Sequence, residues 1–187
     1  MIVVVGPSGA GKDTLMAYAA RAFSERSDVI FARRVITRDI DAGGEDHESV
    51  CDAEFEKLAA AGRFAVSWKA HGLQYGIPVE TKDAVAGGAI VIANGSRSAL
   101  SLFSDAYPNL TVINITARPE VLAMRLEARG RESREDILRR LERSSLGVIG
   151  DYEVVTIDNS GEIEISGRAL IDAVSTLLSQ SFIPGEK

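Results

Sequence analysis

A glycine-rich segment near the start of the chain has the residue types and spacing of a phosphate-binding loop. Residues 6–14 read GPSGAGKDT, with four residues between Gly6 and Gly11 and with Lys12 directly after. A short apolar run precedes the segment and a helical pattern follows it, which is the context that this motif requires. The glycines let backbone N–H groups turn inward, the lysine can reach β- and γ-phosphates, and the helix adds its positive dipole end. We therefore predict that a nucleotide is bound by Gly6, Pro7, Ser8, Gly9, Ala10, Gly11, Lys12, Asp13 and Thr14.

Asp13 departs from the usual motif. The residue after the lysine is normally Ser or Thr, whose hydroxyl binds Mg²⁺. Here Asp13 holds that position and Thr14 follows it. Two interpretations remain open. An acidic side chain in the first helical turn complements the helix dipole, or the carboxylate binds Mg²⁺ directly or through water.

The pattern of apolar residues indicates the elements that position this loop. Continuous apolar runs predict buried strands at residues 2–5, 90–93, 112–115 and 153–157, and helical spacing predicts helices at residues 12–23, 53–61, 96–106, 120–128, 133–145 and 165–178. Strands that alternate with helices predict an α/β fold with a parallel sheet covered on both faces. Residues 39–47 are polar and glycine-rich, so we expect a loop there, and long loops often carry function.

The composition limits the classes of function. A chain of 187 residues suits a single domain, and its net charge of −6 argues against a general nucleic-acid binder. Its one cysteine favours a reducing compartment, so we expect a cytoplasmic protein. No apolar run approaches the roughly 20 residues of a membrane span. The opening MIVVV lacks a basic region and a cleavage site, so it indicates a strand and not a signal peptide.

Arginines are concentrated late in the chain, where seven lie between residues 125 and 143. Glutamates alternate with them, which is typical of a solvent-exposed helix face held by ion pairs. Arginine also offers a planar fork suited to phosphate. Taken alone, the cluster therefore leaves both a surface role and a phosphate-binding role open.

These segments together resemble the guanylate kinase family. GPSGAGKDTL, ITRD at 36–39, YGI at 75–77, RLEARGRESREDILRRL at 125–141 and DNSG at 158–161 follow the order and spacing of that family over nearly the whole chain. The resemblance implies a P-loop NTPase fold of three αβα layers with a central parallel sheet, in one domain over residues 1–187. It implies a core at about 1–32, 90–124 and 148–187, an acceptor-binding segment at about 33–89, and an arginine-rich lid at about 125–147.

The same resemblance implies roles for single residues. Lys12 and Arg38 match residues at the transferred and acceptor phosphates, Arg129 and Arg140 match lid arginines that clamp the phosphates, and Asn159 matches a residue near the adenine. ATP and Mg²⁺ are the implied cofactors. The acceptor site departs from the family, since Asp41 stands where a second arginine is expected and His47 replaces a tyrosine. The guanine-reading segment is FAVSW at 64–68, without an acid, and an unpaired base edge loses discrimination. GMP is therefore not the expected acceptor.

The departures resemble a second group within this family, the ribose 1,5-bisphosphate phosphokinases called PhnN, which belong to phosphonate degradation. The segments that carry this resemblance are RRVITRD with GGEDH at 33–47, SWKAHGLQYGI at 67–77, VIANGSRSAL at 91–100 and ARGRES at 128–133. The resemblance implies ATP-dependent phosphorylation of the 1-phosphate of ribose 1,5-bisphosphate to 5-phosphoribosyl 1-diphosphate (PRPP), with release of ADP. Such an acceptor oxygen is already anionic, so catalysis depends on positioning and positive charge without a general base.

A sugar bisphosphate needs anion sites and hydroxyl contacts. Candidates for the far phosphate of the sugar are Arg33, Arg34, Arg38 and Arg97, candidates for the ribose hydroxyls are Asn94, Ser96, Glu45 and Asp46, and His47 and Tyr75 are further substrate-binding candidates. Strand alternation predicts that one of Arg33 and Arg34 faces solvent. Asn94 ends a predicted strand, where open α/β sheets bind ligands. Trp68 either lines the pocket or belongs to the core.

Two other functions remain alternatives. One is a nucleoside monophosphate kinase of altered base specificity, and the other is a non-catalytic guanylate-kinase-like module that binds a protein. Loss of the loop lysine or the lid arginines would favour the module, but Lys12, Arg129 and Arg140 are all present. We expect ATP and a small sugar bisphosphate as partners and neither nucleic acid nor membrane. The oligomeric state is left open, with a homodimer as one alternative.

Overall fold

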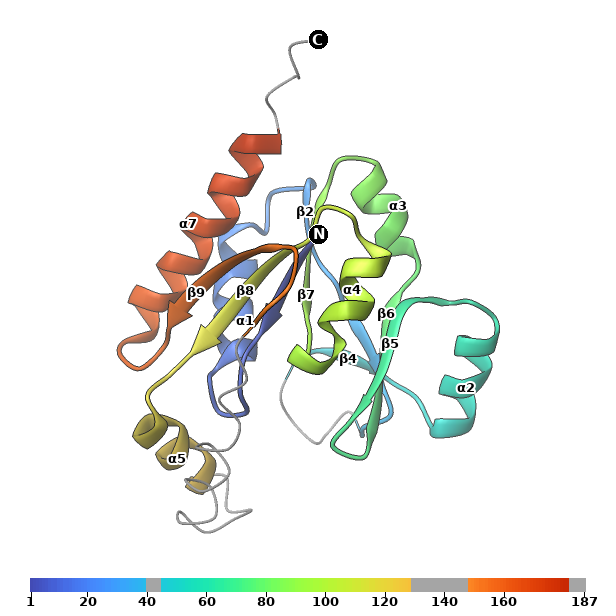
Figure 1. Ribbon diagram of the computed structural model, residues 1–187, viewed down its shortest axis with the longest axis horizontal. Coiled ribbons are helices and arrows are strands. Elements are labelled where there is room, and N and C mark those ends of the chain that lie inside the picture. The colour runs from blue at the N-terminus through green and yellow to red at the C-terminus, as the bar shows by residue number, and fades with distance from the viewer. Residues whose placement is uncertain (40–44, 129–147, 182–187) are drawn as a thin grey trace.

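The structure is a computed structural model that describes residues 1–39, 45–128 and 148–181. Its centre is a five-stranded sheet in the order β2-β7-β1-β8-β9 (Figure 1). These strands are β1 (Ile2–Val5), β2 (Val29–Phe31), β7 (Ile90–Asn94), β8 (Thr111–Thr116) and β9 (Glu153–Asp158). Every neighbouring pair runs parallel, which confirms the parallel sheet predicted from the alternation of strands and helices.

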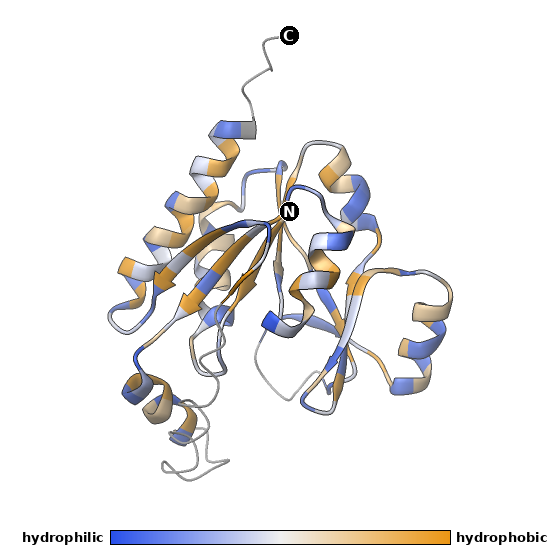
Figure 2. Ribbon diagram, viewed as in Figure 1, coloured by the Kyte–Doolittle hydropathy of each residue, from blue (hydrophilic) through white to orange (hydrophobic). Residues whose placement is uncertain are grey.

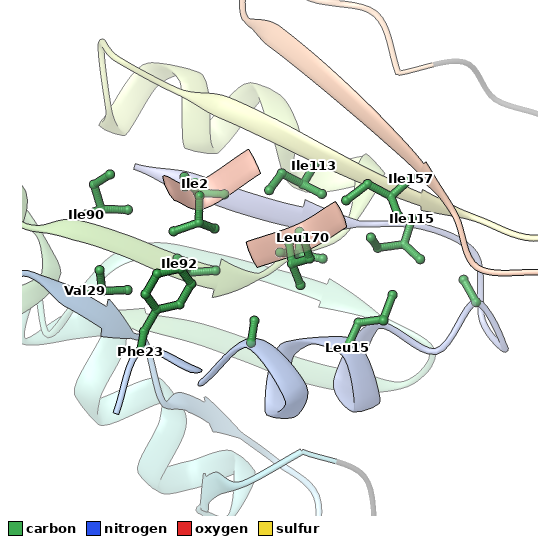
Figure 3. Close-up of a cluster of buried hydrophobic side chains, with 14 of the residues drawn as sticks. Ile2, Leu15, Phe23, Val29, Ile90, Ile92, Ile113, Ile115, Ile157 and Leu170 are labelled. Carbon is green, nitrogen blue, oxygen red and sulfur yellow. The ribbon is translucent and has the colours of Figure 1, made fainter. Parts of the chain in front are cut away.

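Helices cover both faces of this sheet, as predicted (Figure 1). On one face, α1 (Lys12–Ala22) and α7 (Ile163–Ser181) pack against Ile2 and Val4 of β1. Figure 3 shows Leu15 and Leu170 meeting the strand side chains in this layer. On the other face, α3 (Glu80–Ala86) and α4 (Leu100–Ala106) pack against Val3 and Val5. Each fully buried side chain of this size contributes roughly 1.5–3 kcal/mol, and Figure 2 shows how apolar residues concentrate on the strands.

A second sheet of four strands lies beside the core, in the order β4-β3-β6-β5. Its strands are β3 (Arg34–Ile36), β4 (His47–Ser49), β5 (Phe64–Ala70) and β6 (Leu73–Pro78), with α2 (Asp52–Ala60) next to them. Strands β3 and β4 pair in parallel, whereas β6 pairs antiparallel with both β3 and β5. His71 and Gly72 close the β5–β6 hairpin with φ of 52° and 74°, the left-handed pair that tight hairpin turns require.

Two sequence-based expectations need correction. His47 was expected inside a loop, but it begins β4 and pairs in register with Arg34 of β3. The helix expected at residues 96–106 begins as a 3₁₀ turn, Arg97–Ala99, before α4. The helix expected at residues 133–145 lies outside the described residues. Among the described helices, none has the length and apolar character to cross a membrane.

The topology brings the carboxyl ends of β1 and β7 together beside the glycine-rich loop. The chain passes from β7 to β8 across β1, so that β1 lies between them. Because these strands are parallel, their carboxyl ends share one edge of the sheet, where ligands bind in open α/β folds. Val4 lies in register with Asn94, and the Gly95 N–H donates to the Val4 carbonyl oxygen at 2.9 Å. The start of the glycine-rich loop and the end of β7 are therefore neighbours.

Candidate active site

The glycine-rich loop links β1 to α1, as its sequence context predicted. Gly6 has φ of 152°, and a Cβ there would collide with the carbonyl oxygen of Ile115. Gly11 has φ of 85°, and a Cβ there would lie 2.5 Å from Nδ2 of Asn159. Only glycine satisfies both the backbone conformation and the close approach at these positions.

Lys12 folds back over this loop. Its Nζ donates to the carbonyl oxygens of Gly6 at 3.0 Å and Pro7 at 3.2 Å. The pKa of Lys12 is lowered from 10.5 to about 8, mainly by burial; the charges of Arg34 and Arg97 contribute to the lowering, and those of Asp13 and Glu45 oppose it. The groups that act on Lys12 thus come from the loop, from the 33–89 segment and from the turn after β7. A strongly shifted pKa with charged partners from several segments is typical of a functional site.

Asn159 supports the loop from the end of β9. Its Nδ2 donates to the Ala10 carbonyl oxygen at 2.7 Å, its backbone N–H donates to the Thr116 carbonyl oxygen at 2.7 Å, and the residue is 3% exposed. Its Oδ1 is buried and has no hydrogen-bond partner among the described residues. The side chain predicted to lie near the adenine therefore contacts the backbone of the phosphate loop.

Arg125 was not predicted as a site residue. Its Nη1 is buried without a hydrogen-bond partner in the described part of the chain, and it lies 3.9 Å from the position of a Cβ on Gly11. It projects from α5 (Pro119–Glu127), whose Leu122 and Leu126 approach Gly9. The only signal in the sequence was its membership of the arginine cluster.

Asn94 joins the loop to the 33–89 segment. Its Nδ2 donates to Oδ1 of Asp13 at 2.7 Å and to Oε2 of Glu45 at 2.9 Å. Asn94 is 3% exposed and ends β7, as the sequence predicted for its strand position. One amide nitrogen therefore holds two carboxylates at the carboxyl edge of the sheet.

Oxygen ligands for Mg²⁺ are present at this point. Mg²⁺ is usually held by one or two carboxylates together with substrate phosphates and water. Asp13 and Glu45 supply two such carboxylates, and Thr14 of the loop is exposed. Among the described residues, no group of three or more His, Cys, Asp or Glu is placed to hold a metal ion by itself. The donor set fits a magnesium ion that arrives with a nucleotide.

Arg33 and Arg34 face opposite sides, as strand alternation predicted. The Arg33 side chain is 53% exposed, and it donates to Asp46 Oδ1 at 3.1 Å and to the His47 carbonyl oxygen at 3.1 Å. The Arg34 side chain is only 9% exposed. Its Nε donates to Glu45 Oε1 at 2.7 Å, and its Nη2 donates to the same oxygen. Glu45 therefore binds both Arg34 and Asn94.

His47 holds the backbone around Arg38. The residue is 1% exposed, with Nε2 3.1 Å from the Arg38 carbonyl oxygen and Nδ1 3.0 Å from the Glu45 carbonyl oxygen. In either neutral tautomer the ring donates to one of these oxygens. Arg38 Nη2 lies 3.4 Å from His47 Nδ1, and Arg38 Nε is buried with no hydrogen-bond partner among the described residues. Arg38 thus retains a donor for an additional acceptor.

Trp68 and Tyr75 form a parallel aromatic pair across the β5–β6 hairpin. Their ring centroids lie 5.2 Å apart with 9° between the ring planes. Trp68 is 8% exposed and also contacts Phe103, which places it in the core. The structure therefore supports the core interpretation of Trp68.

Some of the remaining site candidates lie in the turn after β7, and the others lie outside the described residues. Ser96 Oγ accepts a hydrogen bond from the Ser98 N–H at 3.4 Å and caps the 3₁₀ turn, and burial lowers the pKa of Arg97. Arg129, Arg140 and Asp41 lie outside the described residues.

Comparison with known proteins places this chain in a family. A family model described as an AAA domain matches residues 2–146. A guanylate kinase from Anaplasma phagocytophilum superposes with a TM-score of 0.69 at 20% identity, covering 95% of this chain and 85% of that one, which shows a shared fold. A gluconokinase from Sinorhizobium meliloti superposes with a TM-score of 0.53 at 18% identity, over 96% of this chain and 93% of that one.

Curated relatives are much more similar. A protein from Agrobacterium fabrum is 62% identical over 93% of this chain and 95% of its own length. One from Rhizobium etli is 59% identical over 96% and 91%, and one from Brucella melitensis is 52% identical over 91% and 88%. All three are named ribose 1,5-bisphosphate phosphokinase PhnN. With this identity over nearly the full length of each chain, the protein belongs to the kinase family of ribose 1,5-bisphosphate phosphokinases, PhnN.

Proposed function

We propose that the protein transfers the γ-phosphoryl group of ATP to the 1-phosphate of ribose 1,5-bisphosphate, giving PRPP and ADP. The observation that carries the proposal is the contact of Asn94 with Asp13 of the phosphate loop and with Glu45 of the 33–89 segment. A donor phosphate on the loop and an acceptor beside Glu45 would meet at that point. The relatives' name supports the choice of acceptor.

The proposed phosphoryl transfer does not require a general base. An oxygen of the acceptor 1-phosphate forms a bond to the γ-phosphorus, and the bond from that phosphorus to the β–γ bridging oxygen breaks, with its electron pair leaving on ADP. The acceptor oxygen is anionic near neutral pH, so the main obstacle is repulsion between anions. Positive groups held in place lower this barrier.

We assign the residues as follows. Lys12 would contact the β- and γ-phosphates from the position that it occupies over the loop. Arg38 would bind the acceptor phosphate through its free donor, with the lid residues Arg129 and Arg140 clamping the transferred group. Further acceptor contacts are proposed for Arg33, Arg34, Glu45, His47, Tyr75, Asn94, Ser96 and Arg97.

Asp13 would hold Mg²⁺ bound to the nucleotide. The Asp13 carboxylate takes the position of the usual Ser or Thr ligand, and Asn94 fixes its orientation. Mg²⁺ at that position supplies neutralisation of charge on the phosphate oxygens. Asn159 would keep the loop in shape through the Ala10 carbonyl oxygen and would lie next to the nucleotide.

Location and assembly are part of the same proposal. Cys51 is a free, exposed cysteine, which suits a reducing cytoplasm. A homodimer is one alternative for the oligomeric state, and light scattering at assay concentrations would decide between it and a monomer.

The test offers ATP and Mg²⁺ with ribose 1,5-bisphosphate, GMP or no acceptor. We expect PRPP and ADP in equal amounts with the sugar bisphosphate, and a kcat/KM for GMP lower by roughly 10⁴–10⁵-fold, the range that unpaired polar groups impose. A comparable kcat/KM with GMP would establish a nucleotide kinase. Absence of ADP release with every acceptor would favour the non-catalytic module.

A further inference from the structure

The guanidinium of Arg34 covers the aromatic pair of the acceptor segment. Its Cζ lies 4.9 Å from the centroid of Tyr75 and 5.7 Å from that of Trp68. The two rings are stacked with 9° between their planes, and the Arg34 guanidinium lies over both of them. A flat cation over aromatic rings is held by the ring quadrupoles. The face of this pair toward Arg34 is therefore occupied by the protein's own side chain.

Glu45 holds Arg34 in this position. Both Nε and Nη2 of Arg34 donate to one oxygen of Glu45, and the other oxygen accepts from Asn94 at 2.9 Å. The side chains of Arg34 and Glu45 are 9% and 14% exposed, so this ion pair is shielded from water. A buried charge that leaves its partner is strongly disfavoured. Arg34 is therefore a fixed part of the acceptor segment.

The covered surface is next to the place where the acceptor must lie. Glu45 and Asp13 share the amide nitrogen of Asn94, and Arg34 is among the charges that act on Lys12. An open aromatic face beside a phosphate site stacks a nucleobase, because every base presents a π-face. With Arg34 on that face, the segment presents an ion pair and an amide in place of a stacking surface.

We propose that Arg34, held by Glu45, excludes nucleobases from the acceptor site and thereby restricts the acceptor to sugar phosphates that carry no base. This inference rests on the proposed function, since it takes the acceptor to lie between Asn94 and the aromatic pair. Arg34 acts here as a specificity determinant and Glu45 as the residue that positions it.

The chain provides a direct probe of this surface. Trp68 is the only tryptophan, so its fluorescence reports on the aromatic pair alone. GMP, AMP and ribose 5-phosphate would be titrated with the nucleotide site saturated by a non-hydrolysable ATP analogue and Mg²⁺. The variants are Arg34→Ala, which uncovers the rings, and Arg34→Lys, which retains a cation that can pair with Glu45. Arg63→Ala is the matched control. Arg63 also pairs with a glutamate, Glu80, at 2.6 Å, but both side chains of that pair are exposed.

We expect no saturable quenching of Trp68 fluorescence by GMP or AMP in the wild type, in Arg34→Lys or in Arg63→Ala. In Arg34→Ala, we expect saturable quenching by both nucleotides, with a Kd roughly 5- to 150-fold below the highest concentration at which the wild type shows none, the range of one base stacked on an aromatic side chain. Circular dichroism tests whether each variant is folded. If Arg34→Ala does not fold, Glu45→Gln serves in its place, because it loosens Arg34 without removing it, and a smaller increase in GMP affinity is expected.

Saturable quenching of the wild type by GMP would overturn the proposal, as would folded Arg34→Ala that binds GMP no better than Arg63→Ala. Turnover of ribose 1,5-bisphosphate by the wild type separates this result from the proposed function. If the sugar bisphosphate is not a substrate but Arg34→Ala gains nucleotide binding, the exclusion of bases stands and the assigned acceptor is wrong. If turnover occurs without such a gain, only the role of Arg34 is wrong.

Discussion

Asn94 donates a hydrogen bond of 2.7 Å to Asp13, a residue 81 positions earlier in the chain. Parallel pairing of β7 with β1 makes this contact possible, because it aligns the end of one strand with the start of the phosphate loop. The same nitrogen also donates to Glu45. Two carboxylates that would otherwise repel each other are therefore held together by one neutral donor.

Asn94→Ala removes that donor and leaves the two carboxylates facing each other. We expect a loss of about 1–3 kcal/mol of unfolding free energy, the penalty of unsatisfied buried polar groups, and a raised KM for the acceptor. Urea unfolding and initial rates measure the two effects. Asn109→Ala, at an exposed asparagine, is the control and should change neither. Equal stability of Asn94→Ala and the control would show that the carboxylates do not depend on Asn94.

Lys12→Met removes a cation that burial makes unfavourable in the folded protein. The lowered pKa of Lys12 means that its charge is less stable there than in the unfolded chain at pH 7. We therefore expect the ligand-free variant to be at least as stable as the wild type while kcat/KM for ATP falls by at least roughly 10³-fold. Thermal unfolding and ADP release measure the two quantities, with exposed Lys57→Met as the control. Retention of near wild-type turnover would contradict the assigned phosphate loop.

Much of the core could be predicted because its signals are local. The phosphate loop has a defined spacing, and β1, β7 and β8 are continuous apolar runs because helices bury both of their faces. Strands β2 and β4 were not predicted, and β3 was implied only by the alternation expected at Arg33 and Arg34, since three residues are too few to show a period. The hairpin of β5 and β6 was missed as well, although its turn is closed by His71 and Gly72.

The contacts within the site depend on pairings between segments that are distant in sequence. Alternation predicted that one of Arg33 and Arg34 faces solvent, but it did not indicate which one. Arg34 meets Glu45 because β3 pairs with β4, which sets Arg34 opposite His47. Asn159 reaches Ala10 only because β9 and β1 flank β8 in one sheet. No spacing in the sequence encodes such a contact.

Arg38→Ala removes the guanidinium whose Nε has no hydrogen-bond partner among the described residues. If Arg38 binds the acceptor phosphate, kcat/KM for ribose 1,5-bisphosphate falls by roughly 10³–10⁵-fold, as for arginine clamps in related phosphoryl transfer, while the KM for ATP changes little. Steady-state rates at varied acceptor and varied ATP separate the two parameters. Arg168→Ala, at an exposed arginine of α7, is the control. An unchanged rate would place the acceptor phosphate elsewhere.

Comparing Gly11→Ala with Gly88→Ala separates the cost of backbone strain from the cost of a steric clash with Asn159. The two glycines have φ of 85° and 89°, so a Cβ costs each roughly 1–2 kcal/mol in the left-handed conformation. A Cβ on Gly88 would meet nothing within 4 Å, whereas one on Gly11 would lie 2.5 Å from Asn159 Nδ2. We expect the larger loss of stability, and a raised KM for ATP, in Gly11→Ala alone. Equal effects in both variants would mean that Asn159 does not constrain the loop.

Tyr107→Phe tests a buried hydroxyl that makes stability depend on pH. Burial raises the pKa of Tyr107 above 10.0, an effect larger than the opposing one of its 2.7 Å hydrogen bond with Thr81. Because the folded pKa is the higher one, the contribution of the neutral phenol is complete below pH 10 and is lost as the pH rises through the folded pKa. The variant should lose about 1 kcal/mol at pH 7 through the missing hydrogen bond. Its stability should then fall less than that of the wild type between pH 9.5 and 11, as measured by urea unfolding.

Tyr152→Phe removes a hydroxyl that donates to the Ile149 carbonyl oxygen and controls for loss of a phenol elsewhere. Parallel pH profiles for the wild type and Tyr107→Phe would show that Tyr107 does not contribute to the alkaline loss of stability.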